Sequence, residues 1–166
     1  MTIQRPCIEE ILENVDIIAR GQWGNWVIQH IVEHGHADDR LRALNIILNH
    51  SATYSTDQFA SKVIEKALKC CGPEIFQSYI AKVVEKEPGR PRVPLIDISS
   101  DVYGNYLIQY VLQNGPPCVR EQISFHVRKH MVSLRGSRYG QRVAFQVERL
   151  RTASQKAVNW HQGRWD

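Results

Sequence analysis

The chain repeats itself, and this self-similarity restricts its possible folds more than any other feature of the sequence. Four seven-residue segments align without gaps, each with an aromatic residue first, glycine or alanine second, a polar residue third and an apolar pair at the fifth and sixth positions. They are residues 23–29, 59–65, 103–109 and 139–145. Regular recurrence of one motif is typical of solenoids, in which each unit buries its apolar face against the next.

The length of one unit follows from the spacing of the third positions. Asn25, Ser61, Asn105 and Gln141 lie 36, 44 and 36 residues apart. The longer interval contains residues 85–94, whose three prolines and one glycine do not fit a helix. Without about eight of these residues the period would again be 36, which is typical of a helical repeat.

Helical periodicity fills most of each unit. In the first unit the apolar residues have the spacing of an amphipathic helix: Val27, Ile28, Ile31 and Val32. Gly35 would end that helix. The helix that follows is expected to bury Leu41, Leu44, Ile47 and Leu48. The chain is therefore predicted to be nearly all helix.

The residues that open each motif have a structural explanation. The aromatic side chains are expected to pack between neighbouring units: Trp23, Phe59, Tyr103 and Tyr139. The small residues after them would let two backbones approach closely: Gly24, Ala60, Gly104 and Gly140. We do not assign these eight residues to a binding site.

The polar positions of the motif are harder to explain by packing. Asn25 and Gln29 are four residues apart and share one helix face, with Trp26 beside them. The next two units carry the same pattern in Ser61, Lys62 and Glu65, and in Asn105, Tyr106 and Gln109. Stacked units would align these side chains into one surface, on which hydrogen-bonding groups are flanked by flat or cationic groups.

Such a surface suits single-stranded RNA, whose unstacked bases offer edges for hydrogen bonds and faces for stacking. An amide donates and accepts, so asparagine with glutamine matches uracil. The carboxylate of Glu65 only accepts, and it fits the N–H groups of guanine. The alternative is an ordinary solvated surface, with Glu65 paired to Lys62 or Lys69. Three copies in register favour base recognition.

At these motifs the sequence resembles the Pumilio (PUF) family of repeat proteins, over residues 8–152. Residues 25–29, 61–65 and 105–109 resemble the five-residue recognition pattern of that family, in which the first and fifth residues contact a base edge and the second stacks. The resemblance implies an all-α fold, a curved α-solenoid of three-helix repeats of about 36 residues. It also implies RNA that runs antiparallel to the protein and begins 5′-UGU, with uracil at Asn105 and Gln109, guanine at Ser61 and Glu65, and uracil at Asn25 and Gln29.

The stacking residues implied by the resemblance are Trp26, Lys62, Tyr106 and Arg142. Lys62 differs from the most frequent stacking residues of the family because it lacks a flat face. The fourth copy of the motif departs further, since Phe145 cannot read a base edge. That copy resembles the terminal half-repeat that caps the solenoid, and Arg142 could still stack over the 5′ uracil.

The units give an expected organisation of residues 1–166 as a partial PUF domain. Repeats are predicted at about 16–51, 52–86 and 95–131, an insertion loop at 86–94, a capping half-repeat at 132–152 and a tail at 153–166. The family has more repeats, so the N-terminal half of the solenoid is expected to be missing. The N-terminal end would then expose an apolar face, which could pair with a second copy or with another chain. This face would consist of Ile8, Ile11, Leu12 and Val15.

Composition excludes several classes of protein. The net charge of +4 is compatible with an anionic partner. The sequence has no nucleophile–base arrangement, phosphate-binding glycine loop or Cys-x-x-Cys pair, so neither an enzyme nor a cofactor is expected. The pairs His30/His34 and His126/His130 fit surface or core positions better than metal sites. No apolar run is long enough to span a membrane.

The predicted function is sequence-specific binding of single-stranded RNA. The resemblance implies recognition of 5′-UGU in 3′ untranslated regions of messenger RNA, in the cytoplasm, with effector proteins of mRNA decay or translation. Two basic groups could contact phosphates, although a solvated face is equally compatible: Lys62, Lys66 and Lys69, and Lys86, Arg90 and Arg92. The alternatives are a protein-binding scaffold, a non-specific nucleic-acid binder, or a truncated product without activity of its own.

Overall fold

The computed structural model describes residues 5–162, with side chains as far as residue 153. Within that range the chain forms twelve helices and no strand. The helices are α1 (Arg5–Glu13), α2 (Val15–Ala19), α3 (Gly24–His34), α4 (Ala37–Asn49), α5 (Ser51–Tyr54), α6 (Ala60–Cys70), α7 (Glu74–Val83), α8 (Pro94–Ser100), α9 (Gly104–Asn114), α10 (Pro117–Lys129), α11 (Met131–Arg135) and α12 (Arg138–Gln162). The prediction of an all-helical chain is confirmed.

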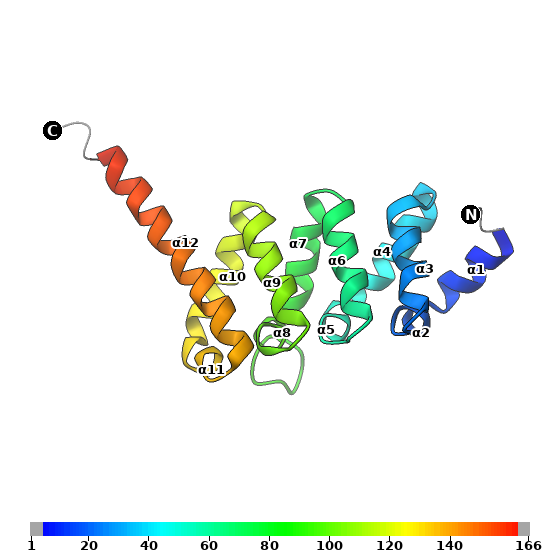
Figure 1. Cartoon of the computed structure of the whole chain (residues 1–166), viewed down its shortest axis with the longest axis horizontal. Helices are drawn as coiled ribbons and strands as arrows, with labels where there is room; N and C mark the ends of the chain where they lie inside the picture. Colours follow the sequence, from blue (N-terminus) through cyan, green and yellow to red (C-terminus); the bar gives the residue numbers. More distant parts are fainter. Residues whose placement is uncertain (1–4, 163–166) are drawn as a thin grey trace.

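The helices form three rows, so that each unit has one short and two longer helices (Figure 1). One row contains α3, α6, α9 and α12, in which each helix contacts the next. A second row contains α4, α7 and α10, and a third contains the short helices α2, α5, α8 and α11. Contacts between equivalent helices of successive units make the chain the predicted α-solenoid.

The core is built from equivalent positions of the units. Ile28, Ile64 and Ile108 occupy the same place in α3, α6 and α9, and all three are fully buried. Each such side chain contributes roughly 1.5–3 kcal/mol through its removal from water. In α4 the prediction was partly wrong. Leu41 is 60% exposed because the buried ridge of α4 consists of Ala43 and Ile47, four residues apart.

The small residue of the motif is required where the short helix meets the next long one. A Cβ atom added to Gly104 would lie 2.6 Å from the carbonyl oxygen of Ile98 in α8 and 3.0 Å from that of Ser55. This contact confirms the predicted close approach of backbones. The aromatic residues of the motif differ in how far they are exposed. Tyr103 is half-buried, whereas Trp23 is 77% exposed because no earlier unit of the described chain covers it.

The N-terminal end differs from the prediction. Leu12 and Val15 are buried, and Ile8 and Ile11 pack partly against the core. These four residues therefore do not form an exposed face, since α1 folds back against α2 and α4. The exposed apolar side chains of this part of the chain include Ile17 and Trp23.

Two other segments are the loop between α7 and α8 and the long helix α12. Residues 84–93 form the loop between α7 and α8, where Arg92 pairs with Asp97 and donates to the Ser133 hydroxyl at 2.9 Å. Helix α12 continues without a break past residue 152, so the predicted boundary between cap and tail falls inside one helix, and residues 163–166 lie outside the described range. None of the described helices has both the length and the hydrophobicity needed to cross a bilayer.

Candidate nucleic-acid interface

Aspartate side chains fix the starts of two of the helices that carry the motif. The Oδ1 atom of Asp57 accepts hydrogen bonds from the backbone amides of Phe59 and Ala60, both at 2.8 Å. In the next unit, Oδ1 of Asp101 accepts from the amides of Tyr103 and Gly104 at the same distances. A carboxylate that accepts from free amides at a helix N-terminus stabilises that end. Ser61 and Asn105 consequently lie at equivalent places in the first turns of α6 and α9.

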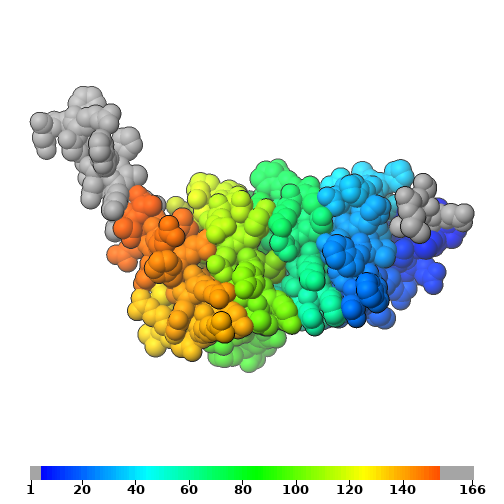
Figure 2. Space-filling view, viewed as in Figure 1, coloured from blue at the N-terminus to red at the C-terminus, as the bar shows by residue number. Residues whose placement is uncertain are grey.

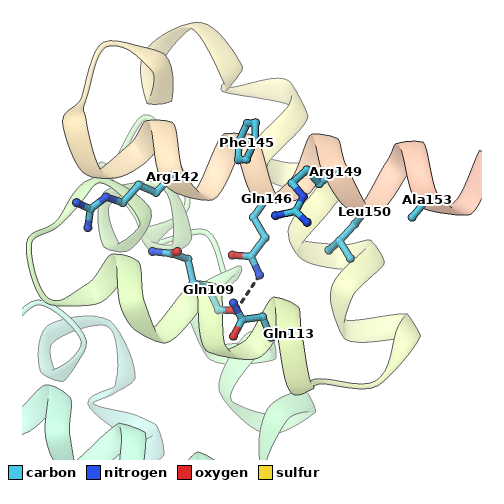
Figure 3. Close-up of a pocket in the computed structure, with 8 residues that line it drawn as sticks. All are labelled: Gln109, Gln113, Arg142, Phe145, Gln146, Arg149, Leu150 and Ala153. Atoms are coloured by element: carbon cyan, nitrogen blue, oxygen red, sulfur yellow. Dashed lines mark hydrogen bonds between the residues drawn. The ribbon is translucent and has the colours of Figure 1, made fainter.

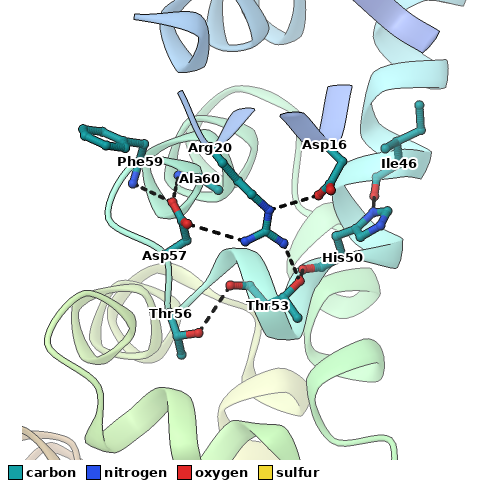
Figure 4. A network of polar contacts seen from close by, with 9 residues as sticks. All are labelled: Asp16, Arg20, Ile46, His50, Thr53, Thr56, Asp57, Phe59 and Ala60. Carbon is teal, nitrogen blue, oxygen red and sulfur yellow. Dashed lines mark hydrogen bonds and ion pairs between the residues drawn. The ribbon is translucent and has the colours of Figure 1, made fainter. Parts of the chain in front are cut away.

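Arg20 ties the first unit to the aspartate of the second (Figure 4). Its Nε donates to Asp16 within the same unit at 3.2 Å. Its two Nη atoms reach across to the hydroxyl of Thr53 at 3.3 Å and to Oδ2 of Asp57 at 3.5 Å. The guanidinium therefore links α2 to the segment from which α6 starts, and it helps to hold the two units in register.

Four exposed side chains lie on successive helices of the α3–α6–α9–α12 row, which faces the viewer in Figure 1. We call this surface the recognition face and define it by Trp26, Lys62, Tyr106 and Arg142. Nη1 of Arg142 donates to the Tyr106 hydroxyl at 3.1 Å, and its Cζ lies 5.9 Å from the centre of the Tyr106 ring. Figure 2 shows the units following one another across one continuous surface.

The base-edge residues of the second unit lie beside aromatic side chains of the third. Ser61, Lys62 and Glu65 of α6 line a depression of about 390 Å³ whose opposite wall includes Tyr103 and Tyr106. The structure therefore brings the predicted residues of neighbouring units together, with a flat aromatic side chain beside a hydrogen-bonding pair.

The two asparagine–glutamine pairs share a helix face as predicted, but the asparagines are not open to solvent. Asn25 is 1% exposed and Asn105 is fully buried. The Nδ2 atom of Asn25 donates to the carbonyl oxygens of Gly21 and Gln22, both at 2.8 Å, and its Oδ1 accepts from Nε2 of Gln29 at 2.9 Å. The expectation of exposed asparagine amides was wrong, because the residues before each helix offer them carbonyl partners.

Glu65 is partly exposed and forms an ion pair with Lys69, one of the two partners that the sequence suggested. The Nζ atom of Lys69 also lies 5.6 Å from the centre of the Tyr110 ring. Lys66 donates to Glu33 at 2.8 Å across α3 and α6. This hydrogen bond lowers the pKa of Glu33 and raises the pKa of Lys66. Two of the three lysines of α6 that could contact phosphates are thus paired within the chain.

A hollow of about 520 Å³ lies beyond Gln109, between α9 and α12 (Figure 3). Nε2 of Gln146 donates to the carbonyl oxygen of Gln109 at 3.1 Å and holds the two helices together. Exposed Phe145 and the basic side chains of Arg142 and Arg149 line the hollow. Sequence reasoning missed Arg149, because it lies outside the repeated seven-residue motif.

The fourth copy of the motif is arranged differently from the other three. Nε2 of Gln141 donates to the carbonyl oxygen of Arg135 at 2.7 Å, and Phe145 stands where the other units have glutamine or glutamate. Among the residues that the structure describes, no group of three or more histidine, cysteine or acidic side chains could hold a metal ion.

Comparison with known proteins places these features in a family. The model of the Pumilio-family RNA binding repeat matches residues 14–48, 50–84 and 95–123. Meiotic PUF family protein 1 of Schizosaccharomyces pombe is 46% identical over 149 residues, which cover 90% of this chain and 26% of that protein. Pumilio homolog 4 of Arabidopsis thaliana is 32% identical over 159 residues, which cover 93% of this chain and 15% of that protein. This chain thus spans about a quarter or less of the length of these relatives.

Solved structures agree with the sequence comparison. The crystal structure of PUF-8 in complex with PBE-RNA superposes with a TM-score of 0.78 at 27% identity, covering 87% of this chain and 42% of that one. The Puf3 RNA binding domain, bound to a Cox17 RNA 3′ UTR recognition sequence, gives a TM-score of 0.71 at 20% identity, covering 85% and 44%; this likeness concerns the fold alone. Because the repeat model matches most of residues 14–123, in three consecutive units, this chain belongs to the Pumilio family of repeat proteins.

Proposed function

We propose that this chain binds single-stranded RNA and reads the sequence 5′-UGU. The third unit takes the first uracil, at Asn105 and Gln109. The second unit takes guanine, at Ser61 and Glu65, and the first unit takes the second uracil, at Asn25 and Gln29. The observation that carries the proposal is the recurrence, on three touching helices of one face, of an exposed flat or cationic side chain beside a hydrogen-bonding pair.

Stacking supplies the part of the binding energy that does not depend on sequence. Trp26, Tyr106 and Arg142 offer flat groups at the surface, and Lys62 offers a cation between them. Each base–aromatic stack is worth about 1–3 kcal/mol. The hydrogen bond between Arg142 and Tyr106 supports a role for Arg142 over the first uracil, because it holds the guanidinium next to the ring on which that base would stack.

Base edges supply the specificity. The amides of Gln29 and Gln109 can both donate and accept, as the edge of uracil requires. The carboxylate of Glu65 accepts only, and guanine presents two neighbouring N–H donors that match it. Guanine would replace Lys69 as the partner of at least one carboxylate oxygen, and the exposure of this ion pair makes that exchange possible. The PUF-8 structure, determined in complex with PBE-RNA, supports RNA as the ligand.

The proposal is tested by titrating fluorescently labelled RNA containing UGU, and a matched RNA containing ACA, at one stated salt concentration. Association alone costs at least about 4 kcal/mol, so three bases should give weak but selective binding. We expect tighter binding of the UGU strand. Equal affinity for both strands would favour a non-specific binder, and no binding of either would favour a protein scaffold.

The cellular part of the proposal goes beyond the chain itself. We place its activity in the cytoplasm, on 3′ untranslated regions, where bound effector proteins would repress or degrade the messenger RNA. Exposed Ile17 and Trp23 make self-association through the N-terminal end part of this proposal. Sequencing of RNA crosslinked to the protein in cells tests whether the protein acts on 3′ untranslated regions. Sedimentation of wild type and Trp23→Ser tests self-association. Only a chain that self-associates through this end would form a smaller assembly after the substitution.

A further inference from the structure

A second hollow, of about 340 Å³, lies between α10 and α12. Helix α10 belongs to the second row of helices, and none of the residues that line this hollow belongs to the recognition face. The lining carries three arginines, Arg120, Arg128 and Arg151, and one acidic residue, Glu121. The hollow therefore has an excess of positive charge, and we call it the arginine hollow.

The arginines of this hollow are poorly satisfied within the described part of the chain. Arg120 is partly buried, and its Nε is shielded from solvent without a hydrogen-bond acceptor. Arg128 donates from Nε to the carbonyl oxygen of Ser124 at 3.1 Å, which leaves its two Nη atoms for a ligand. Neither Arg120 nor Arg151 forms an ion pair with a carboxylate of the described residues. A guanidinium that is partly removed from water attracts an anion more strongly than a fully hydrated one.

The first unit provides a comparison within the same chain. Arg40 stands at the place in α4 that Arg120 has in α10, and its Nε is also buried without an acceptor. The buried nitrogen is therefore a feature of the fold at this place and does not by itself mark a site. Eight residues later, on the same side of the helix, the first unit has Leu48, whereas the third unit has Arg128 and α12 adds Arg151. The cluster of arginines distinguishes the third unit.

The lining of the arginine hollow fits an acidic peptide better than RNA. Guanidinium groups bind carboxylates through paired hydrogen bonds. No aromatic side chain lines this hollow, so single-stranded RNA would find no group on which to stack its bases. We propose that the arginine hollow is a docking site for an acidic segment of a partner protein. Its carboxylates would pair with Arg120, Arg128 and Arg151, and an apolar residue of the segment would pack on Val147 and Leu150. This inference does not depend on which bases the recognition face reads.

The test measures binding of two labelled peptides to the whole chain at low salt, by fluorescence anisotropy. One peptide has glutamates on both sides of a central leucine, and the other has glutamine in place of each glutamate. We expect the chain to bind the glutamate peptide more tightly. Arg120→Gln should weaken that binding about tenfold, on the scale of one lost charge-assisted hydrogen bond. Arg40→Gln is the matched control, because it removes the same charge at the equivalent place of α4 and should leave the affinity unchanged.

Three outcomes would overturn the inference. The first is equal affinity for the two peptides, or binding of neither. The second is an equal loss in Arg120→Gln and Arg40→Gln, which would mean that the peptide responds only to the overall charge of the chain. The third is displacement of the peptide by UGU RNA together with weaker RNA binding by Arg120→Gln, which would assign the hollow to RNA. If Arg120→Gln does not fold, Arg151→Gln, at an exposed position, is measured with the same expectations.

Discussion

The second and third units hold their reading groups in opposite ways. In the third unit Gln109 is bound to a fully buried asparagine, which is itself bound to the backbone. In the second unit the carboxylate of Glu65 is held only by Lys69, and nearly half of each of these side chains is exposed. The difference shows that the amide of Gln109 has a buried partner that holds it in place, whereas the carboxylate of Glu65 has a partner at the surface that can be exchanged.

The scaffold beneath the two units is nevertheless the same. Asp57 and Asp101 stabilise the starts of α6 and α9 through hydrogen bonds of equal length. Ile64 and Ile108 occupy equivalent places in the core. The contrast between the units is therefore confined to side chains near the recognition face. Exchanging those side chains should exchange the base preferences of the two units.

The strongest test of the contrast converts the second unit into a copy of the third. In the double variant Ser61→Asn/Glu65→Gln, the second unit carries the reading residues of the third, and the preferred sequence should change from UGU to UUU. We expect a loss of about 1–3 kcal/mol in binding UGU and a similar gain for UUU. Competition binding with the two strands measures both.

The single variant Glu65→Gln is the matched control for this exchange. It introduces the glutamine without the asparagine, so its gain in binding UUU should be smaller than that of the double variant. An unchanged preference of the double variant for UGU would show that Ser61 and Glu65 do not read guanine.

A second prediction compares how much the stacking residues of the two units, Tyr106 and Lys62, contribute to RNA binding. Tyr106→Ala should weaken RNA binding by about 1–3 kcal/mol, because an aromatic face is lost. Lys62→Ala should weaken it by less, and its effect should fade as salt rises, because a lysine acts on phosphates through charge. Phe125→Ala is the control, since Phe125 is an exposed aromatic residue on α10, outside the recognition face. Equal effects of Tyr106→Ala and Phe125→Ala would contradict the assignment of the face.

A third prediction concerns the scaffold that both units share. Asp101→Ala should lower the free energy of unfolding by about 0.5–2 kcal/mol, because two backbone amides at the start of α9 lose their acceptor. Asp57→Ala should cost somewhat more, since it also removes the link to Arg20. Urea denaturation measures both, with Asp38→Ala, at an exposed position of α4, as control. A smaller effect at Asp57 than at Asp101 would mean that the link to Arg20 contributes nothing.

Much of the fold could be predicted from the sequence because solenoid units repeat their local chemistry. The recurring motif predicted that Ile28, Ile64 and Ile108 are equivalent core residues, and that Gly104 allows close contact between helices. Trp26 and Tyr106 could be assigned to an exposed face from their spacing alone, and the structure places both at the surface.

What the sequence could not predict depends on neighbours outside the motif. Asn105 is buried because the carbonyl oxygens of Asp101 and Val102 turn toward it, and no residue pattern indicates where a backbone carbonyl points. Trp23 is exposed although its motif matches that of Tyr103, because burial of this residue requires a preceding unit. The hollow beside Phe145 depends on α12, which is longer than its counterparts α3, α6 and α9.

The smallest expected effect concerns the ion pair between Lys69 and Glu65 in the second unit. In Lys69→Met the ion pair is lost, and the free energy of unfolding should fall by less than about 1 kcal/mol, since the pair is exposed. This difference should disappear at about 1 M salt, where charges on the surface are screened. Preference for UGU over UUU should remain, because the carboxylate alone matches guanine. Lys66→Met, which breaks the pair with Glu33, is the control for a lost surface charge. If Lys69→Met abolished the preference while Lys66→Met did not, Lys69 would belong to the guanine site.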